Sequence, residues 1–117
     1  MPNFYMDMHM YFDLYKNKNE VLKYIEDKKS YTLAVTNLPD LYRKYYAENW
    51  DYKYVRLALG FHPELASQYY AQISIFEKYF KTTRYIGEIG LDYSASNIEN
   101  VDKQKEVFKK IVDLCKA

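Results

Sequence analysis

Three short apolar runs, each leading directly into polar residues, limit the folds open to this chain. The runs are residues 4–6, 55–59 and 84–86. They lead respectively into Asp7 and His9, into His62, and into Glu88, which lies between Gly87 and Gly90. Parallel strands bring their carboxyl ends to one edge of a sheet, where α/β folds bind their ligands. The pattern therefore predicts that both histidines and the acidic groups meet at that edge.

Strand-like and helical patterns alternate along the whole chain. β-branched and apolar content predicts strands at residues 4–9, 31–36, 54–59 and 85–89. The expected helices are one capped by Asn19, one from Pro39 through Asn49, the longest from Glu64 to Phe80, and one from Val101 to the end, after a polar loop at 94–100. Four such units predict a single α/β domain over residues 1–117, with a parallel sheet and right-handed crossovers.

The number of these units is about half of that in a (β/α)8 barrel, which takes about 250 residues. Four parallel strands alone leave two open edges and one sheet face without full cover. Three arrangements remain open: the N-terminal half of a barrel, a chain that pairs with another chain, or a small open α/β sheet. We expect a second copy or a partner protein to cover the exposed edges and apolar faces.

Composition and charge narrow the class of protein. A hydrophobic content of 49% with 28% charged residues is typical of a soluble globular chain. No apolar run approaches the ~20 residues of a membrane span, so no membrane association is expected. The net charge of +1 gives no support for DNA binding through a basic face. The fifteen tyrosines are spread along the chain, which favours compositional bias over a set of base-stacking platforms.

The N-terminus and the single cysteine bear on the compartment. The first residues lack the positive segment of a signal peptide, and Asp7 and Asp13 interrupt the apolar pattern. Cys115 has no second cysteine for an internal disulfide. These features predict a reducing, cytoplasmic location, with Cys115 as core filler on the last helix.

The polar residues at the first predicted strand share one face. Asp7, His9 and Tyr11 are spaced by two, so their side chains point the same way along a strand. A histidine beside a carboxylate can bind a metal ion through one ring nitrogen. A polar strand end with satisfied hydrogen bonds accounts for the same spacing.

The other candidate residues also have two interpretations each. Glu88 stands in an otherwise apolar stretch, where an unpaired carboxylate is costly to bury and a cation would compensate it. The alternative is a solvated glutamate at a strand end. His62 is either a site residue or a neighbour of a helix cap, and Asp92 either orients a ligand or is a loop acid. Oxygen and imidazole ligands suit Mg, Mn or Zn, and two such ions would support an in-line displacement at phosphorus.

Three motifs, taken together in their order and spacing, resemble those of the TatD family of metal-dependent DNases. They are Asp7-Met8-His9-Met10-Tyr11, Gly60-Phe61-His62-Pro63 and Gly87-Glu88-Ile89-Gly90-Leu91-Asp92, and Gln104 with Phe108 is similar to the family's Gln-x-x-x-Phe helix. The likeness covers essentially the whole chain. Finer features at residues 13–15, 63–65 and 84–86 are similar to the TatD-like proteins of Qat anti-phage defence systems.

This resemblance implies the N-terminal half of a TIM (β/α)8-barrel metallohydrolase, a truncated TatD-like domain that cleaves phosphodiester bonds, typically of DNA. It implies divalent metal ions (Mg, Mn or Zn) as cofactors. His9 and Glu88 are the expected metal ligands, with Asp7 and Tyr11 adjacent, and Tyr11 stands where the family has its second metal-binding histidine. Glu88, His62 and Asp92 are the expected catalytic residues, with His62 near the substrate phosphate.

Three functions follow from these observations. The first is a TatD-like nuclease whose further metal ligands lie on later strands. The second is a non-catalytic binding or assembly subunit derived from the same fold, which Tyr11 favours. The third is a metallohydrolase with a substrate other than nucleic acid, because one barrel supports many chemistries.

Overall fold

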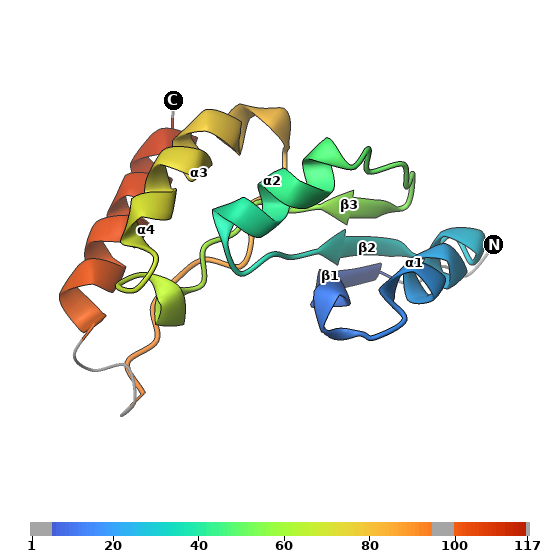
Figure 1. The fold of residues 1–117 in the computed structure, drawn as a ribbon, viewed down its shortest axis with the longest axis horizontal. Helices are drawn as coiled ribbons and strands as arrows, with labels where there is room; N and C mark the ends of the chain where they lie inside the picture. The colour runs from blue at the N-terminus through green and yellow to red at the C-terminus, as the bar shows by residue number, and fades with distance from the viewer. Residues whose placement is uncertain (1–5, 95–99, 117) are drawn as a thin grey trace.

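The chain folds as three parallel strands with helices packed beside them (Figure 1). The structure, a computed structural model, describes residues 6–94 and 100–116. Its elements are β1 (Met6–Met10), α1 (Lys18–Asp27), β2 (Tyr31–Ala34), α2 (Pro39–Ala47), β3 (Val55–Leu57), α3 (Ile73–Tyr79) and α4 (Val101–Cys115). Short 3-10 helices lie at Phe12–Leu14, Pro63–Leu65, Tyr70–Gln72 and Phe80–Thr82. The predicted α/β class and parallel sheet are confirmed.

The sheet has the order β1-β2-β3, so β1 is an edge strand. Thr32 of β2 lies opposite Asp7 on one side and Val55 on the other. Alternate residues of β2 and β3 are buried, which gives these two strands one covered face: Thr32, Ala34, Val55 and Leu57. In β1, every residue from Met6 to His9 is exposed and only Met10 is buried. The edge strand therefore has little cover on either face.

Aromatic side chains make up much of the core. Phe12 packs edge-on against Tyr45 and Trp50, with ring centroids 4.8 and 5.2 Å apart. Tyr42 is buried on α2 and stacks on Tyr46 of the next turn. Among the helices that the structure describes, none has the length and apolar character needed to cross a membrane.

The fourth strand, predicted at residues 85–89, is reduced to a single parallel bridge between Leu59 and Ile86. The pairing begins as expected, because the N–H of Gly87 donates to the carbonyl oxygen of Leu59 at 2.9 Å. The ladder then becomes irregular, because the Gly87 oxygen and the Glu88 N–H pair with the backbone of Thr36, beyond the end of β2, while the Glu88 oxygen accepts the N–H of Phe61. β2 and β3 each end two residues earlier than predicted, whereas β1 ends one residue later, at Met10. Residues 4 and 5 of the first predicted strand lie outside the described range.

The prediction of one long helix over residues 64–80 is wrong. This stretch contains two separate 3-10 helices before α3, and a third follows α3. At the break, Gln72 turns toward α2, where its side-chain oxygen accepts the N–H of Asp40 at 3.0 Å. This bond satisfies a donor that the first turn of α2 leaves open. The Ser74 hydroxyl donates to the carbonyl oxygen of Ala71, which competes locally with regular helix.

Two side chains on other helices also differ from prediction. α1 begins at Lys18 with Asn17 at the N-cap, so Asn19 lies in the first turn and is not the cap. Cys115, predicted as core filler, is exposed. The buried stripe of α4 is Gln104, Val107 and Ile111, and it ends one turn before Cys115.

Candidate functional site

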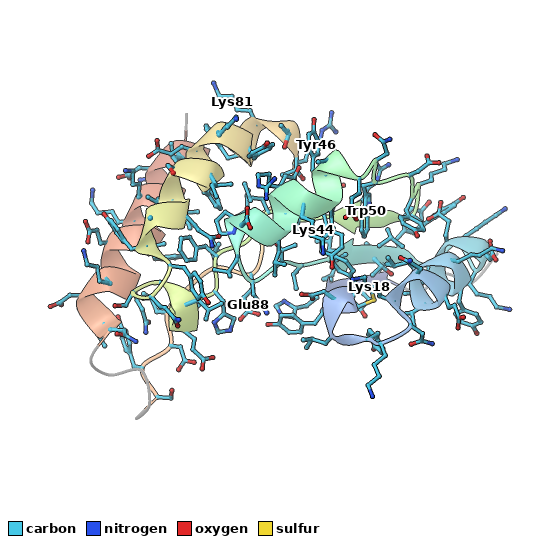
Figure 2. All side chains as sticks on the ribbon, viewed as in Figure 1. Lys18, Lys44, Tyr46, Trp50, Lys81 and Glu88 are labelled. Atoms are coloured by element: carbon cyan, nitrogen blue, oxygen red, sulfur yellow. The ribbon has the colours of Figure 1, made fainter. Side chains whose placement is uncertain are left out.

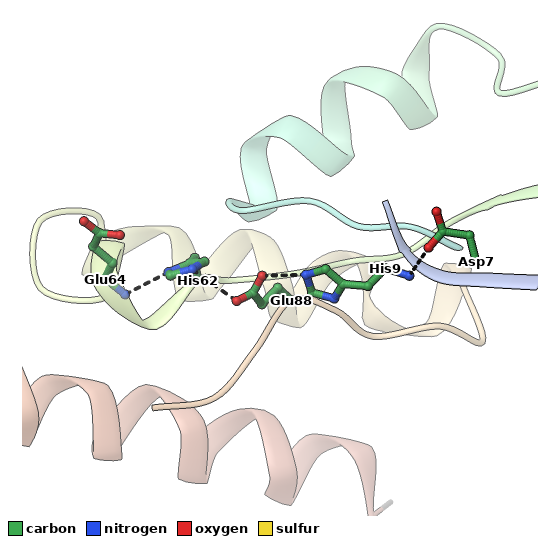
Figure 3. Close-up of polar contacts among 5 residues, drawn as sticks. All are labelled: Asp7, His9, His62, Glu64 and Glu88. Carbon is green, nitrogen blue, oxygen red and sulfur yellow. Dashed lines mark hydrogen bonds and ion pairs between the residues drawn. The ribbon is translucent and has the colours of Figure 1, made fainter. Parts of the chain in front are cut away.

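Glu88 lies near the carboxyl ends of the strands (Figure 2), between two histidines (Figure 3). The Nε2 atom of His9 is 3.0 Å from Glu88 Oε1, and the Nε2 atom of His62 is 3.1 Å from Oε2. His9 comes from the end of β1, and His62 immediately precedes the 3-10 helix Pro63–Leu65. The structure thus brings together three of the residues that the strand pattern placed at one edge.

Thr36 positions the backbone of Glu88, a role that no sequence motif indicated. The N–H of Glu88 donates to the carbonyl oxygen of Thr36, and the N–H of Thr36 donates to the carbonyl oxygen of Gly87, both at 3.1 Å. The Thr36 hydroxyl donates to the carbonyl oxygen of Ala58 and accepts the N–H of Gly60, both at 2.9 Å. Thr36 is buried, where leaving such groups unpaired would be costly. The chain beneath Glu88 is therefore held from two neighbouring strands.

Gly60 allows these segments to meet. A Cβ atom at this position would lie 1.9 Å from the carbonyl oxygen of Thr36 and 2.4 Å from both the Glu88 nitrogen and the Gly87 oxygen. Space, rather than an unusual φ, therefore requires a glycine here. The next residue, Phe61, donates its N–H to the carbonyl oxygen of Glu88 at 2.8 Å. Both backbone polar groups of Glu88 are thus engaged.

The carboxylate of Glu88 is only partly satisfied. Its Oε1 atom is buried and has no hydrogen-bond donor within residues 6–94 and 100–116. His9 approaches this oxygen to ion-pair distance, but without the alignment of a hydrogen bond. The side-chain oxygen of Asn37, which follows Thr36, is likewise buried without a partner in the described residues. Buried oxygens of this kind call for a cation or a polar ligand.

The ring of His62 has a defined tautomer. Its Nδ1 atom accepts the N–H of Glu64 at 3.1 Å. A ring nitrogen that accepts carries no proton, so neutral His62 carries its proton on Nε2, the atom that faces Glu88. In this state Nε2 donates a hydrogen bond and does not ligate a metal ion. His62 is therefore suited to hold a carboxylate or a phosphate oxygen.

His9 is less constrained than His62. Its side chain is 50% exposed, against 19% for His62. The ring of Tyr11 packs edge-on against it, with centroids 4.9 Å apart. The carboxylate of Asp7 accepts the N–H of His9 at 3.0 Å and lies on the side of His9 away from Glu88 (Figure 3). Asp7 therefore stabilises the backbone of β1, and Tyr11 supports the ring.

Asp92 is placed by helix α4. The side-chain oxygen of Gln104 accepts the N–H of Asp92 at 2.8 Å, and its amide nitrogen donates to the carbonyl oxygen of Asp92 at 2.9 Å. The Asp92 carboxylate accepts the N–H of Ser94. Gln104, the first residue of the Gln-x-x-x-Phe pattern, thus anchors the segment that follows Gly90. The catalytic role of Asp92 stays a prediction.

The donor types at the site fit a divalent cation, but the set is partial. His9 supplies an imidazole and Glu88 a carboxylate, which suit Mg, Mn or Zn. A catalytic zinc site uses about three protein ligands. The part of the chain that the structure describes has no group of three or more His, Cys, Asp or Glu side chains that could hold a metal ion. Further ligands would have to be water, Asn37 or groups beyond the described residues.

Comparison with known proteins gives a family and a fold. The family described as TatD related DNase matches residues 6–117. Among solved structures, the chain is similar to YjjV, a TatD homologue from Escherichia coli K12, with a TM-score of 0.76 and 17% sequence identity. The match covers 94% of this chain and 46% of that chain, so the chain spans about half the length of that structure. No curated protein matches.

Proposed function

This chain belongs to the TatD-related DNase family, and from that membership we propose that it carries one half of a metal-dependent phosphodiesterase site that acts on DNA. The observation that supports the proposal is the position of Glu88 between His9 and His62, at the carboxyl ends of the strands. This is the edge at which barrel enzymes bind their substrates. The arrangement combines a metal-binding carboxylate with an imidazole donor.

In this proposal His9 and Glu88 hold a divalent metal ion (Mg, Mn or Zn). When bound, such an ion supplies Lewis-acid stabilisation of a phosphate oxygen. His62 donates a hydrogen bond from Nε2 to a second oxygen of the phosphate. Thr36 keeps the backbone of Glu88 in place. Asp92, held by Gln104, orients the segment beside the site.

We further propose that a second copy or a partner protein covers the open half of the barrel. Met6 and Met8 of the edge strand are 61% and 59% exposed, and Tyr31 of β2 is 48% exposed. An uncovered edge strand offers unpaired backbone groups to another chain. The cover would also supply the ligands that complete the metal site.

Calorimetric titration with Mn²⁺ tests the metal site. Wild type should bind, and Glu88→Gln should lose at least about tenfold in affinity because it removes the anionic ligand (about 1.4 kcal/mol per tenfold). Glu64→Gln is the matched control, since the Glu64 carboxylate is near His62 but only its N–H contacts the ring. Equal binding by wild type and Glu88→Gln would contradict the proposal.

A non-catalytic binding or assembly subunit is the second candidate. It is supported by Tyr11 beside His9, where a phenol is a poor substitute for an imidazole ligand. A Tyr11→His variant distinguishes the two functions. If only this variant binds Mn²⁺ and cleaves labelled DNA, Tyr11 has disabled the site and the non-catalytic function is favoured. If wild type cleaves DNA and Glu88→Gln does not, the nuclease function holds.

We also propose that this function serves cytoplasmic anti-phage defence. It rests on sequence features at residues 13–15, 63–65 and 84–86, which are similar to those of Qat-associated TatD-like proteins. Phage plating on cells that carry the intact operon tests it. Replacing the gene with its Glu88→Gln form should raise the plating efficiency, whereas Glu64→Gln should not. Full protection by both variants would remove the catalytic role in defence.

A further inference from the structure

A hollow lies between α2, β3 and residues 82–85, away from Glu88. Its volume is about 480 Å³. The residues that give it its chemistry are Tyr46, Trp50, Tyr52, Arg56, Arg84 and Tyr85. Figure 2 shows Tyr46 and Trp50 well separated from Glu88 along the molecule. The volume is within the range of about 300–1,000 Å³ that is usual for small-molecule sites.

The aromatic wall on α2 is held in position. Tyr46 stacks on Tyr42, with ring centroids 5.7 Å apart and planes 18° apart. The Tyr42 hydroxyl is hydrogen-bonded to the Thr82 hydroxyl at 2.7 Å. Tyr46 is 45% exposed, so one part of its ring is packed and another is open. The open part of the Tyr46 ring is free to stack against an aromatic ligand.

Trp50 and the segment around Arg84 are also held by hydrogen bonds. Trp50 donates its ring N–H to the carbonyl oxygen of Val55 at 2.8 Å. The Thr83 hydroxyl donates to the carbonyl oxygen of Leu57 at 3.0 Å and accepts the N–H of Tyr85 at 3.1 Å. The Thr83 side chain therefore connects the segment around Arg84 to β3. These bonds fix the backbone on two sides of the hollow.

Two arginines give the hollow a positive charge. Arg56 and Arg84 are both exposed, and neither forms an ion pair with a carboxylate of residues 6–94 or 100–116. By contrast, Arg43 on α2 pairs with Asp40 at 2.7 Å. The described lining contains no aspartate or glutamate. Guanidinium groups stay protonated and bind phosphate through paired hydrogen bonds.

We propose that this hollow is a ligand site for a nucleoside phosphate, distinct from the site at Glu88. The phosphate lies against Arg56 and Arg84, and the base packs against Tyr46 or Trp50. The combination of the half-exposed Tyr46 ring with two guanidiniums that have no carboxylate partner among the described residues selects a ligand that joins an aromatic ring to an anion. The same chemistry is found in a free nucleotide and in the phosphorylated end of a nucleic-acid strand.

Fluorescence of Trp50 tests the proposal, because Trp50 is the single tryptophan of the chain. The probes are adenosine 5′-monophosphate, adenosine, inorganic phosphate and a 5′-phosphorylated single-stranded hexanucleotide. EDTA is present throughout, so that the outcome does not depend on the metal site. The monophosphate should change the Trp50 emission saturably and bind at least about tenfold more tightly than adenosine or phosphate alone.

Arginine variants locate the effect. Arg84→Gln and Arg56→Gln should each weaken binding of the monophosphate at least about fivefold, whereas Arg43→Gln should not change it. Circular dichroism verifies that the variants fold, which is expected because these side chains are exposed. Tighter binding of the hexanucleotide than of the monophosphate assigns the site to a strand end; otherwise the ligand is a free nucleotide. The proposal is overturned if the monophosphate binds no better than phosphate, or if Arg43→Gln weakens binding as much as the other two.

Discussion

The two sides of the Glu88 site are built in different ways. The backbone of Glu88 is bonded to Thr36 and Phe61, directly over a glycine that has no room for a Cβ atom. His9 is on β1, an edge strand that is exposed from Met6 through His9. The bonds of this chain therefore fix the backbone of Glu88, whereas His9 lies on a strand with little cover. The site is held firmly where the strands converge and is open at β1.

We call Glu88, with Thr36, Gly60 and Phe61, which hold its backbone, the well-built side of the site. The largest expected effect is on this side. Gly60→Ala should destabilise the protein by about 3 kcal/mol or more, because the added methyl group meets three backbone atoms that cannot move independently. Thermal unfolding followed by circular dichroism measures this. With a total stability of about 5–15 kcal/mol for a typical domain, this is a large part of the free energy of unfolding.

Gly87→Ala is the matched control for that substitution. A Cβ atom at Gly87 would meet only the Val35 side chain, at 3.3 Å, and a side chain can shift by a few tenths of an ångström. We expect a much smaller loss of stability. If the two glycine variants melt at the same temperature, close approach at Gly60 is not what holds Glu88.

Thr36 offers a second way to break the well-built side. Thr36→Val keeps the shape of the side chain but leaves the Ala58 carbonyl oxygen and the Gly60 N–H without this partner. A buried group left unpaired costs about 1–3 kcal/mol, so we expect a loss of about 2–3 kcal/mol in urea unfolding. Thr36→Ser keeps the hydroxyl and should retain most of the stability. Equal losses in the two variants would show that the hydroxyl contributes no more to stability than the methyl group does.

The contrast between Thr36 and the motif residues shows what a sequence reveals about such a site. His9, His62 and Glu88 could be placed together from strand periodicity alone, because residue type and position at strand ends are local signals. Thr36 could not, since a threonine that ends a β-branched run has the properties of an ordinary strand residue. Its role arises from backbone groups of Ala58, Gly60, Gly87 and Glu88, which are far along the chain.

The same limit explains the errors in the fold. The break before α3 depends on the bond between Gln72 and Asp40, which joins residues 32 positions apart. The fourth strand is short because Gly87 and Glu88 bond to Thr36, a partner that no local pattern identifies. The alternation of strands and helices was predictable because each unit must bury its own apolar stripe. Contacts that decide where an element ends were not.

The prediction for the exposed strand β1 is tested by measuring self-association of the protein. Met8→Lys places a charge on the uncovered edge strand, where Met8 is 59% exposed. We expect wild type to associate at high concentration and this variant to remain monomeric in light scattering, with a change in unfolding free energy within about 0.5 kcal/mol. Tyr24→Lys is the control, because Tyr24 is 64% exposed on α1. A monomeric wild type would show that β1 needs no second chain.

The smallest expected effect concerns the core behind the well-built side and appears only at high pH. Burial raises the pKa of Tyr42 above the ordinary value for a phenol, while its hydrogen bond with Thr82 acts in the opposite direction to a lesser extent. The unfolded chain releases this proton near pH ~10, but the folded chain retains it to higher pH. The stabilisation is therefore full below pH ~10 and is lost as the pH rises toward the folded pKa, by at most about 1.4 kcal/mol per pH unit. Melting temperatures between pH 8 and 11 should fall less steeply for Tyr42→Phe than for wild type. If Tyr42→Phe keeps the wild-type slope, the Tyr42 phenol is solvated in the folded chain. The tightly packed region around Thr36 then does not include Tyr42 on α2.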